Sequence, residues 1–209
     1  EYLIFGALWW EVIRITQYTM TVGSLWNVWS RNLSNMFIAP ISLSEYLIAQ
    51  MFSGLWKSGA VVFFLLIPIS NAVFHFNVFS IGAALVGAIY INLLLFSWSI
   101  GLVLLGAIFR YGTRVQALGW AFIFIFQPLG AVFYPVYVLP STLQYISLLF
   151  PVTYIFEGGR AALSGAPDAW TWQILAFALN CVYFLAAILI FRKFLHHAQN
   201  SGQFARNET

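Results

Sequence analysis

The chain has 209 residues, of which 62% are hydrophobic, 19% are aromatic and only 7% carry a formal charge. This composition excludes a soluble domain with an ordinary charged surface and indicates an all-α protein that crosses a membrane several times. The net charge is +3, from 9 basic and 6 acidic residues. The unpaired basic side chains are too few for a nucleic-acid partner.

Five hydrophobic runs predict transmembrane helices, because crossing a hydrocarbon core of about 30 Å takes about 20 helical residues. In chain order they cover residues 2–29, 46–69, 81–109, 115–139 and 170–191. No linker divides them, so we expect one transmembrane domain over residues 1–209. The chain begins at Glu1 without a methionine or a signal pattern. We therefore expect a fragment whose full chain has one more span upstream, six in all.

The basic residues outside these runs predict which side of the membrane each connection faces. Those that follow the first, third and fifth runs fall on one side: Arg31, Arg110, Arg114, Arg192, Lys193 and Arg206. The positive-inside rule makes that side cytoplasmic. Glu1 then lies outside the cell, and a tail over residues 196–209 lies in the cytoplasm.

A cytoplasmic segment, 30–45, joins the first two runs and contains a short amphipathic helix that Pro40 ends. Its apolar face carries Leu33, Met36 and Phe37, and its polar face carries Arg31, Asn32, Ser34 and Asn35. The helix either lies on the lipid surface or acts as a rigid lever against a partner protein. After it, Ser42 and Glu45 have the spacing of a capping box for the next span, with Ile41 and Tyr46 as its hydrophobic staple.

From 115 to 156 no residue carries a formal charge, and four prolines interrupt the run: Pro128, Pro135, Pro140 and Pro151. Two full spans would fit this length. They would also move Arg192 and Lys193 to the outside, against the positive-inside rule. The sequence therefore predicts one span followed by two short helices over 140–165, which form a re-entrant hairpin on the outer side.

Local signals predict where these two short helices begin and end. The first has Ser141 as its N-cap and Gln144 as its capping-box partner, and it ends before Pro151. The second stops at Ser164 and Gly165, where glycine suits a left-handed backbone conformation.

Few charged residues lie within the expected spans, where an uncompensated charge costs about 3 kcal/mol or more. Glu11 and Arg14 share one helical face, so they either form a structural ion pair or line a transport pathway. Lys57 has no carboxylate three or four residues away. We expect it to face the protein interior or to extend toward the membrane surface, with a role either in packing or an interface or in substrate contact.

Glu157 and Arg160 are one helical turn apart at the mouth of the predicted hairpin. They form either a local salt bridge of little energetic effect or an outer gate. We identify no catalytic residue and no metal site. His196 and His197 are adjacent, so on a helix they point about 100° apart, and Cys181 is the one cysteine of the chain.

Two regions resemble the membrane subunits of type-2 ATP-binding-cassette exporters. The first is Trp-Ser-Arg-Asn-Leu at 29–33, followed by Ala-Pro-Ile-Ser at 39–42 and by Glu45, and it is similar to the family's coupling-helix region. The second is similar to the family's outer re-entrant helices and comprises Pro128-Leu129, Phe133-Tyr134-Pro135, Leu139-Pro140, Pro151-Val152-Thr153-Tyr154, Glu157-Gly158-Gly159-Arg160 and Gly165. The resemblance covers nearly the whole chain but lacks the family's first span.

The resemblance implies a permease subunit of the plasma membrane, specifically a bacterial inner membrane, that exports its substrate outward. It implies a dimer with a second copy and a separate cytoplasmic ATPase. The residues implied to couple to that ATPase are Arg31, Asn32, Ser34, Asn35, Met36 and Phe37. Because the sequence contains no G-x-x-x-x-G-K-[ST] loop, ATP and Mg are expected on the ATPase and no cofactor on this chain.

Three function classes stay open. An exporter of this family would move an amphiphile, drug, lipid or glycan, with a polysaccharide exporter as the main alternative within the family. An ion-coupled carrier or channel would use Glu11, Arg14 and Lys57. A membrane enzyme acting on lipid would need converging catalytic groups, such as an H-E-x-x-H motif, which the sequence lacks.

Overall fold

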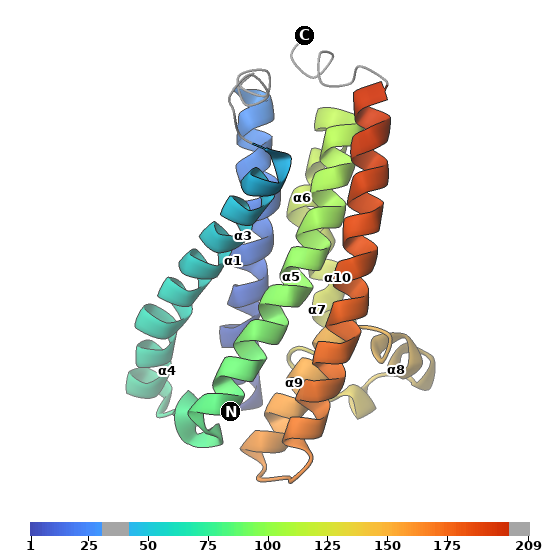
Figure 1. The fold of residues 1–209 in the computed structure, drawn as a ribbon. Coiled ribbons are helices and arrows are strands. Elements are labelled where there is room, and N and C mark those ends of the chain that lie inside the picture. Colours follow the sequence, from blue (N-terminus) through green and yellow to red (C-terminus); the bar gives the residue numbers. More distant parts are fainter. Residues whose placement is uncertain (31–41, 201–209) are drawn as a thin grey trace.

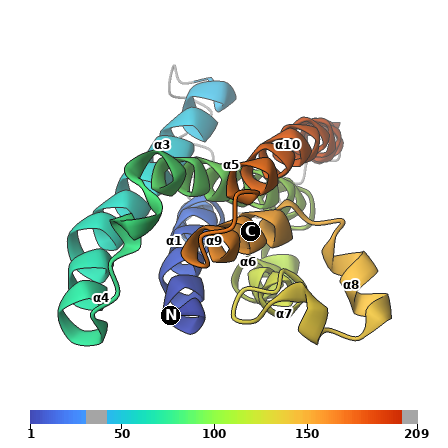
Figure 2. The same ribbon diagram turned by 90° about the horizontal axis from the view of Figure 1, so that it is seen from below.

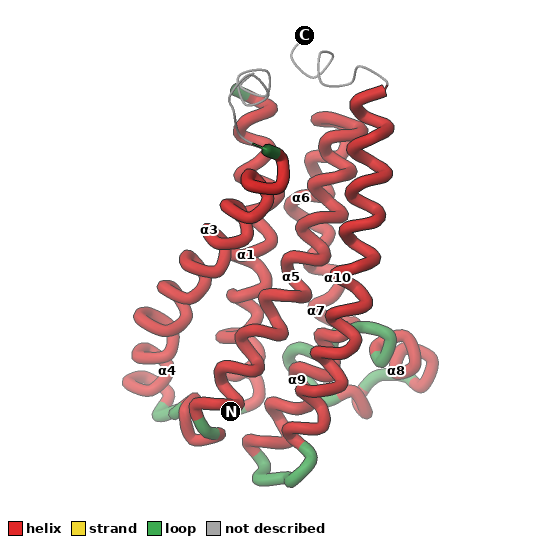
Figure 3. Tube along the Cα trace, viewed as in Figure 1, coloured by secondary structure: helices red, strands yellow, loops and turns green. Residues whose placement is uncertain are grey.

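Figure 1 shows the computed structural model, which describes residues 1–30 and 42–200. These residues form helices joined by short connections, and neither described range contains a strand (Figure 3). The all-α prediction is therefore confirmed for the described part of the chain. The segment 31–41, with the proposed coupling residues and Ile41 of the staple, lies outside it.

Three helical stretches are long and apolar enough to cross a membrane: Leu43–Phe74, Ala83–Tyr111 and Ala169–Asn200. The second is α5 and the third is α10. The first is continuous but has three parts, namely α3 (Leu43–Val61), a π-helical turn (Val62–Leu66) and α4 (Ile67–Phe74). Their length and composition indicate a membrane protein.

The capping box predicted at the start of α3 is present. The backbone N–H of Ser42 donates to Oε2 of Glu45 at 2.7 Å, and the N–H of Glu45 donates to Oγ of Ser42 at 3.2 Å. These two bonds satisfy two of the backbone donors that a helix start leaves free.

α1 (Tyr2–Trp29) matches the predicted helix over 2–29 and packs between α3 and α5. Its buried apolar residues include Phe5, Trp9 and Ile13, which belong to the main hydrophobic core. Because Glu11, Arg14 and Gln17 reduce its apolar character, α1 is not among the three helices that composition alone marks as membrane-crossing. A helix enclosed by other helices tolerates such polar side chains better than one that faces lipid.

The helix expected over 115–139 is shorter and broken. It consists of a 3₁₀ turn (Gly112–Val115), α6 (Gln116–Ala121), a second 3₁₀ turn (Phe122–Ile125) and α7 (Phe126–Leu129). Only a 3₁₀ turn, Val136–Val138, occurs between Gly130 and Leu139. Proline explains the difference in part, since Pro128, Pro135 and Pro140 cannot donate a backbone hydrogen bond.

Two short helices follow, α8 (Ser141–Ser147) and α9 (Pro151–Leu163). The capping box predicted at Ser141 is wrong, because Pro140 occupies the N-cap and no side chain caps the helix. The Gln144 side chain instead donates to the carbonyl of Leu139 at 2.7 Å. The predicted end of the second helix is confirmed, with Gly165 in a left-handed conformation at φ 73°.

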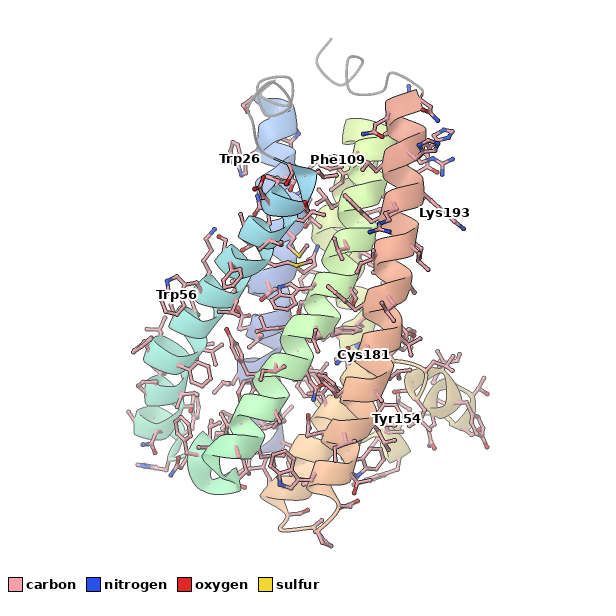
Figure 4. The ribbon with its side chains drawn as sticks, viewed as in Figure 1. Trp26, Trp56, Phe109, Tyr154, Cys181 and Lys193 are labelled. Carbon is pink, nitrogen blue, oxygen red and sulfur yellow. The ribbon has the colours of Figure 1, made fainter. Side chains whose placement is uncertain are left out.

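The helices arrange the charges at one end of the bundle. The C-terminal ends of α1, α5 and α10 lie together there (Figure 1), and we call it the basic end, after Arg110, Arg114, Arg192 and Lys193. Residue Glu1, α9 and the turn between α4 and α5 lie at the opposite end, which we call the α9 end. Figure 4 shows Lys193 and Tyr154 near these two ends. Since α10 runs to Asn200, residues 196–200 of the predicted tail are helical.

Seen along the bundle, α1 and α9 lie near its centre and α5 and α10 lie beside each other along one edge, with α3 and α4 to one side and α8 to the other (Figure 2). The main core lies among α1, α5 and α9, and a second cluster around Met20, Leu105 and Phe191 joins α1, α5 and α10 toward the basic end.

Candidate functional site

The α9 end holds the residues that the sequence marked as a gate, and α9 is its centre. Pro151 begins the helix, where its missing N–H costs nothing, and Gly165 follows its end. The buried residues of α9 include Val152, Ile155 and Phe156. These side chains face the main core, so tertiary packing holds this helix of only 13 residues in place.

Two consecutive glycines allow α9 to fit between α10 and α1. A Cβ atom on Gly158 would lie 2.7 Å from Nε2 of Gln173 and 2.8 Å from Cβ of Trp172, both on α10. A Cβ atom on Gly159 would overlap the ring of Phe5 on α1. Neither position has room for a methyl group unless a neighbouring side chain or helix moves.

Glu157 and Arg160 form the predicted ion pair, with 2.9 Å between Nη2 of Arg160 and Oε1 of Glu157. The Arg160 side chain is only 4% exposed and that of Glu157 is 19% exposed. Nη1 of Arg160 also donates to the carbonyl of Val132 at 3.4 Å, while Oε1 of Glu157 accepts from the N–H of Val136 at 2.7 Å. The pair therefore connects α9 to the non-helical segment that follows α7.

This burial distinguishes the pair from an exposed salt bridge of little effect. Removing the carboxylate partner of a buried cation lowers the free energy of unfolding of a protein by about 3–5 kcal/mol. Nε of Arg160 has no hydrogen-bond partner in the described part of the chain. The pair is well placed to hold the segment 130–136 against α9, and its role as a gate stays a prediction.

The connection between α8 and α9 is fixed by side-chain hydroxyl groups. Oγ1 of Thr153 donates to the carbonyl of Ser147 at 2.6 Å, and Oγ of Ser147 donates to the carbonyl of Leu129. The hydroxyl of Tyr183, on α10, donates to the carbonyl of Leu149 at 3.0 Å. Ser147 is buried, whereas Ser164, just after the end of α9, is exposed.

Irregular backbone in the broken fourth helix is satisfied by α1. Nε2 of Gln17 donates to the carbonyl of Gly119 at 3.1 Å, and Oγ1 of Thr21 donates to the same carbonyl at 3.3 Å. The hydroxyl of Tyr18 donates to the carbonyl of Trp120 at 3.0 Å. Backbone of this kind is tolerated at membrane depth where protein groups replace the missing helical bonds.

The predicted pair on α1 is present. Nε of Arg14 lies 3.0 Å from Oε1 and 2.9 Å from Oε2 of Glu11, and the two side chains are 38% and 27% exposed. The guanidinium group also lies over the Tyr18 ring, at 5.8 Å from its centroid. The pair is thus structural within this chain, and its exposed part leaves the pathway interpretation open.

Lys57 does not face the protein interior, as one of our two interpretations expected. Its side chain is exposed on α3, and it forms no ion pair within the described residues. The neighbouring Trp56 is 79% exposed and points away from the bundle (Figure 4). Lys57 therefore meets lipid, the membrane surface or another chain.

Besides Gln17 on α1, sequence reasoning missed the buried amides Asn92 on α5 and Gln173 and Asn180 on α10. They connect α5, α10 and α9 by hydrogen bonds. The signal was available, because an amide within a long apolar run is costly unless it finds a partner. Which partner it finds depends on packing that the run itself does not specify.

A cavity of about 300 Å³ lies between α5, α10 and the broken fourth helix. Phe122 and Phe126 line it from the fourth helix, and the hydroxyl groups of Ser99 and Tyr183 are among its few polar atoms. In the described residues no group of three or more His, Cys, Asp or Glu side chains could hold a metal ion. The cavity is suited to an apolar group.

Fold and composition thus define the class as a helical membrane protein. Neither the known protein-family models nor the curated proteins include a match to this chain.

Proposed function

We propose that this chain is the transmembrane subunit of an ATP-driven exporter of the type-2 ATP-binding-cassette class. The observation that carries the proposal is the pair of short helices, α8 and α9, after a broken fourth helix and at the end opposite the basic residues. This order agrees with the outer re-entrant helices that the sequence resemblance implies.

The proposal includes five membrane crossings in this chain. The crossings would be α1, the continuous helix from α3 to α4, α5, the broken segment from α6 to α7, and α10. The basic residues at one end support a cytoplasmic position for that end. The α9 end would then face outward, with α8 and α9 as a re-entrant pair.

In the proposed cycle, a partner ATPase binds ATP and Mg and closes, and the segment 31–37 transmits that movement to the spans of a permease dimer. The spans then change between two states and release the substrate outward. Glu157 and Arg160 would hold the segment 130–136 closed in one state and release it in the other. The apolar cavity beside Phe122 and Phe126 favours an amphiphile, drug or lipid over a polysaccharide as substrate.

Purification and reconstitution of the full-length protein test this function. We expect an ATPase subunit to co-purify and the complex to export a hydrophobic fluorescent dye from proteoliposomes only with ATP. Replacing Arg31, Met36 and Phe37 together by alanine should abolish ATP-dependent export, whereas His197→Ala, a control for the cytoplasmic end, should not. Full-rate transport without ATP would contradict the proposal.

One observation supports the second candidate, an ion-coupled carrier or channel. Glu11 and Arg14 are partly exposed in the middle of α1, where a pathway for ions would need charged groups. In that case transport would follow an imposed ion gradient and would fall when Glu11 is replaced by glutamine. The same proteoliposomes, without ATP, decide between the two functions.

A further inference from the structure

Three amide side chains form a buried chain of hydrogen bonds that begins between two membrane-crossing helices and ends on α9. We call Asn180, Asn92 and Gln173 the amide ladder. Their exposed fractions are 0%, 3% and 2%, so none can exchange its partners for water without a change in packing. In such surroundings a donor without a partner is costly.

The ladder has a single direction. Nδ2 of Asn180 donates to Oδ1 of Asn92 at 3.2 Å, and Nδ2 of Asn92 donates to Oε1 of Gln173 at 3.1 Å. Nε2 of Gln173 donates to the backbone carbonyl of Ile155 at 3.0 Å. Asn92 and Gln173 each donate through the amide nitrogen and accept through the amide oxygen, so each bond polarises and strengthens the next. Oδ1 of Asn180, at the start of the ladder, has no hydrogen-bond partner in the described residues.

The last bond ties the ladder to α9 and uses a lone pair that the helix leaves free. A carbonyl oxygen has two lone pairs, so Ile155 accepts from Gln173 in addition to any bond within its helix. Gly158 makes this approach possible, because a Cβ atom there would lie 2.7 Å from Nε2 of Gln173. The contact between α9 and α10 at this point thus requires both the small size of Gly158 and the amide group of Gln173.

α9 also contacts α10 through the rings of Tyr154 and Trp172, whose centroids lie 5.7 Å apart, and it contacts α1 through Gly159 and Phe5. Among the side-chain hydrogen bonds that reach α9 in the described residues, the bond from the ladder is anchored on α5 and α10, which run to the basic end, whereas the ion pair reaches Val132 and Val136 in the segment before α9. A shift of α5 against α10 would strain or break the bonds of the ladder, and Gln173 would pass that change to α9.

We propose that the amide ladder positions α9 on the pair of α5 and α10, with Gln173 as the residue through which these two helices set the position of the Glu157–Arg160 gate. Its link to transport rests on the proposed function, whereas the positioning of α9 does not. Gln173 is a positioning residue, because it acts on the gate through the backbone of α9.

Hydrogen exchange measured on the full-length protein in lipid nanodiscs tests the positioning. Gln173→Met keeps the volume of the side chain and removes its hydrogen bonds. We expect the amides of α9 to exchange at least about tenfold faster in this variant, with those of α5 within about twofold of the unchanged protein. Equal exchange of α9 in both proteins, or equal acceleration throughout the bundle, would overturn the proposal.

Two further variants distinguish the loss of this contact from a general loss of folding. Gln50→Met is the matched control, because the Gln50 amide donates to the Tyr46 hydroxyl at 3.1 Å within its own helix, and α9 should be unaffected. Gly158→Ala should reproduce the effect of Gln173→Met by displacing an intact Gln173. The two changes combined should add only in part, since both disrupt the contact of Gln173 and Gly158→Ala also crowds Cβ of Trp172, and full additivity would refute this link.

A distance measurement gives the readout that a purely structural role would not change. Spin labels on the native Cys181, which is exposed, and on Ser164→Cys, at the end of α9, report the position of α9 against α10. We expect one narrow distance distribution in the otherwise unchanged protein and a broad one with Gln173→Met. A narrow distribution at the same distance in both proteins would count against the ladder.

A transport assay on the complex of this protein with its co-purified ATPase tests the link to the gate. Gln173→Met should reduce ATP-dependent dye export by about tenfold while ATP hydrolysis stays within about twofold, because the gate and not the ATPase is affected. If no ATPase co-purifies, the proposed function fails, and the exchange and distance results still decide whether the ladder positions α9. If export and hydrolysis fall together, Gln173 does not act on the gate.

Discussion

Arginine occurs at both ends of the bundle but in different surroundings. At the α9 end, Arg160 is buried and held by Glu157 and by the carbonyl of Val132. At the basic end, Arg110 lies over the rings of Tyr111 and Phe194, at 4.9 and 5.3 Å from their centroids, while Arg192 and Lys193 are exposed. The comparison indicates that Arg160 depends on the exact position of its partners, whereas at the basic end the positive charge of the side chains matters more than any single contact.

The largest effect is expected from Glu157→Ala. The variant leaves Arg160 buried without its carboxylate, so the free energy of unfolding should fall by about 3–5 kcal/mol. Reversible unfolding in a denaturing detergent measures this. Glu157→Gln still accepts a hydrogen bond from the Val136 N–H and should lose less stability. If Glu157→Ala lost less stability than the variants at the basic end, the proposed difference between the two ends would be wrong.

Gly159→Ala should have the next largest effect. Its methyl group would overlap the Phe5 ring, and the overpacking should cost about 1–3 kcal/mol in the same unfolding measurement. Gly87→Ala is the matched control, because nothing lies within 4 Å of its added Cβ atom. Equal stability of the two variants would show that α9 is not tightly packed against Phe5 on α1.

A smaller effect is expected from Arg110→Gln at the basic end. This change removes the contacts of the guanidinium group with Tyr111 and Phe194, and contacts of this kind contribute about 0.5–1 kcal/mol. Arg110→Lys, which keeps the charge, should recover part of the loss. A loss as large as that of Glu157→Ala would show that the basic end also depends on exact partners.

The smallest effect on stability is expected from Arg192→Gln combined with Lys193→Gln. Both side chains are exposed, so the unfolding midpoint should stay unchanged. Orientation should change instead, because the positive-inside bias is weaker. Labelling of Ser164→Cys by a membrane-impermeant reagent on intact cells should fall, while it stays constant in an Asn200→Ala control.

Local signals were sufficient for much of the fold. The helices over 2–29 and 81–109, the capping box at Ser42 and Glu45, and the ion pair of Glu157 and Arg160 all depend on residues close together in the chain. Apolar runs and i, i+3 spacing report such features directly. The span count needs the membrane itself as well as the helices, and it stays part of the proposal.

The features that were missed depend on distant residues. The broken fourth helix needs Gln17 and Thr21 to satisfy the carbonyl of Gly119, about a hundred positions away. The amide ladder joins Asn92 to residues of α10 across a similar separation. The exposure of Lys57 and the tight fit of Gly159 against Phe5 likewise follow from helix packing, which a hydrophobic run does not encode.

The π-helical turn at Val62–Leu66 changes the register of the continuous helix Leu43–Phe74. The buried positions along this helix are Gly54, Ser58, Val62, Ile67 and Ser70, so the step across the turn is five residues instead of three or four. The wider turn accommodates this extra residue and returns the lower half of the helix to the same side of the bundle. Deleting one residue there would restore a regular helix with Val62 and Ile67 four positions apart, still on the same face. If the full-length segment formed a regular α-helix instead, Ile67 and Ser70 would rotate by about 100° toward lipid, so the π-helical turn sets which face of the second half of this helix meets the protein.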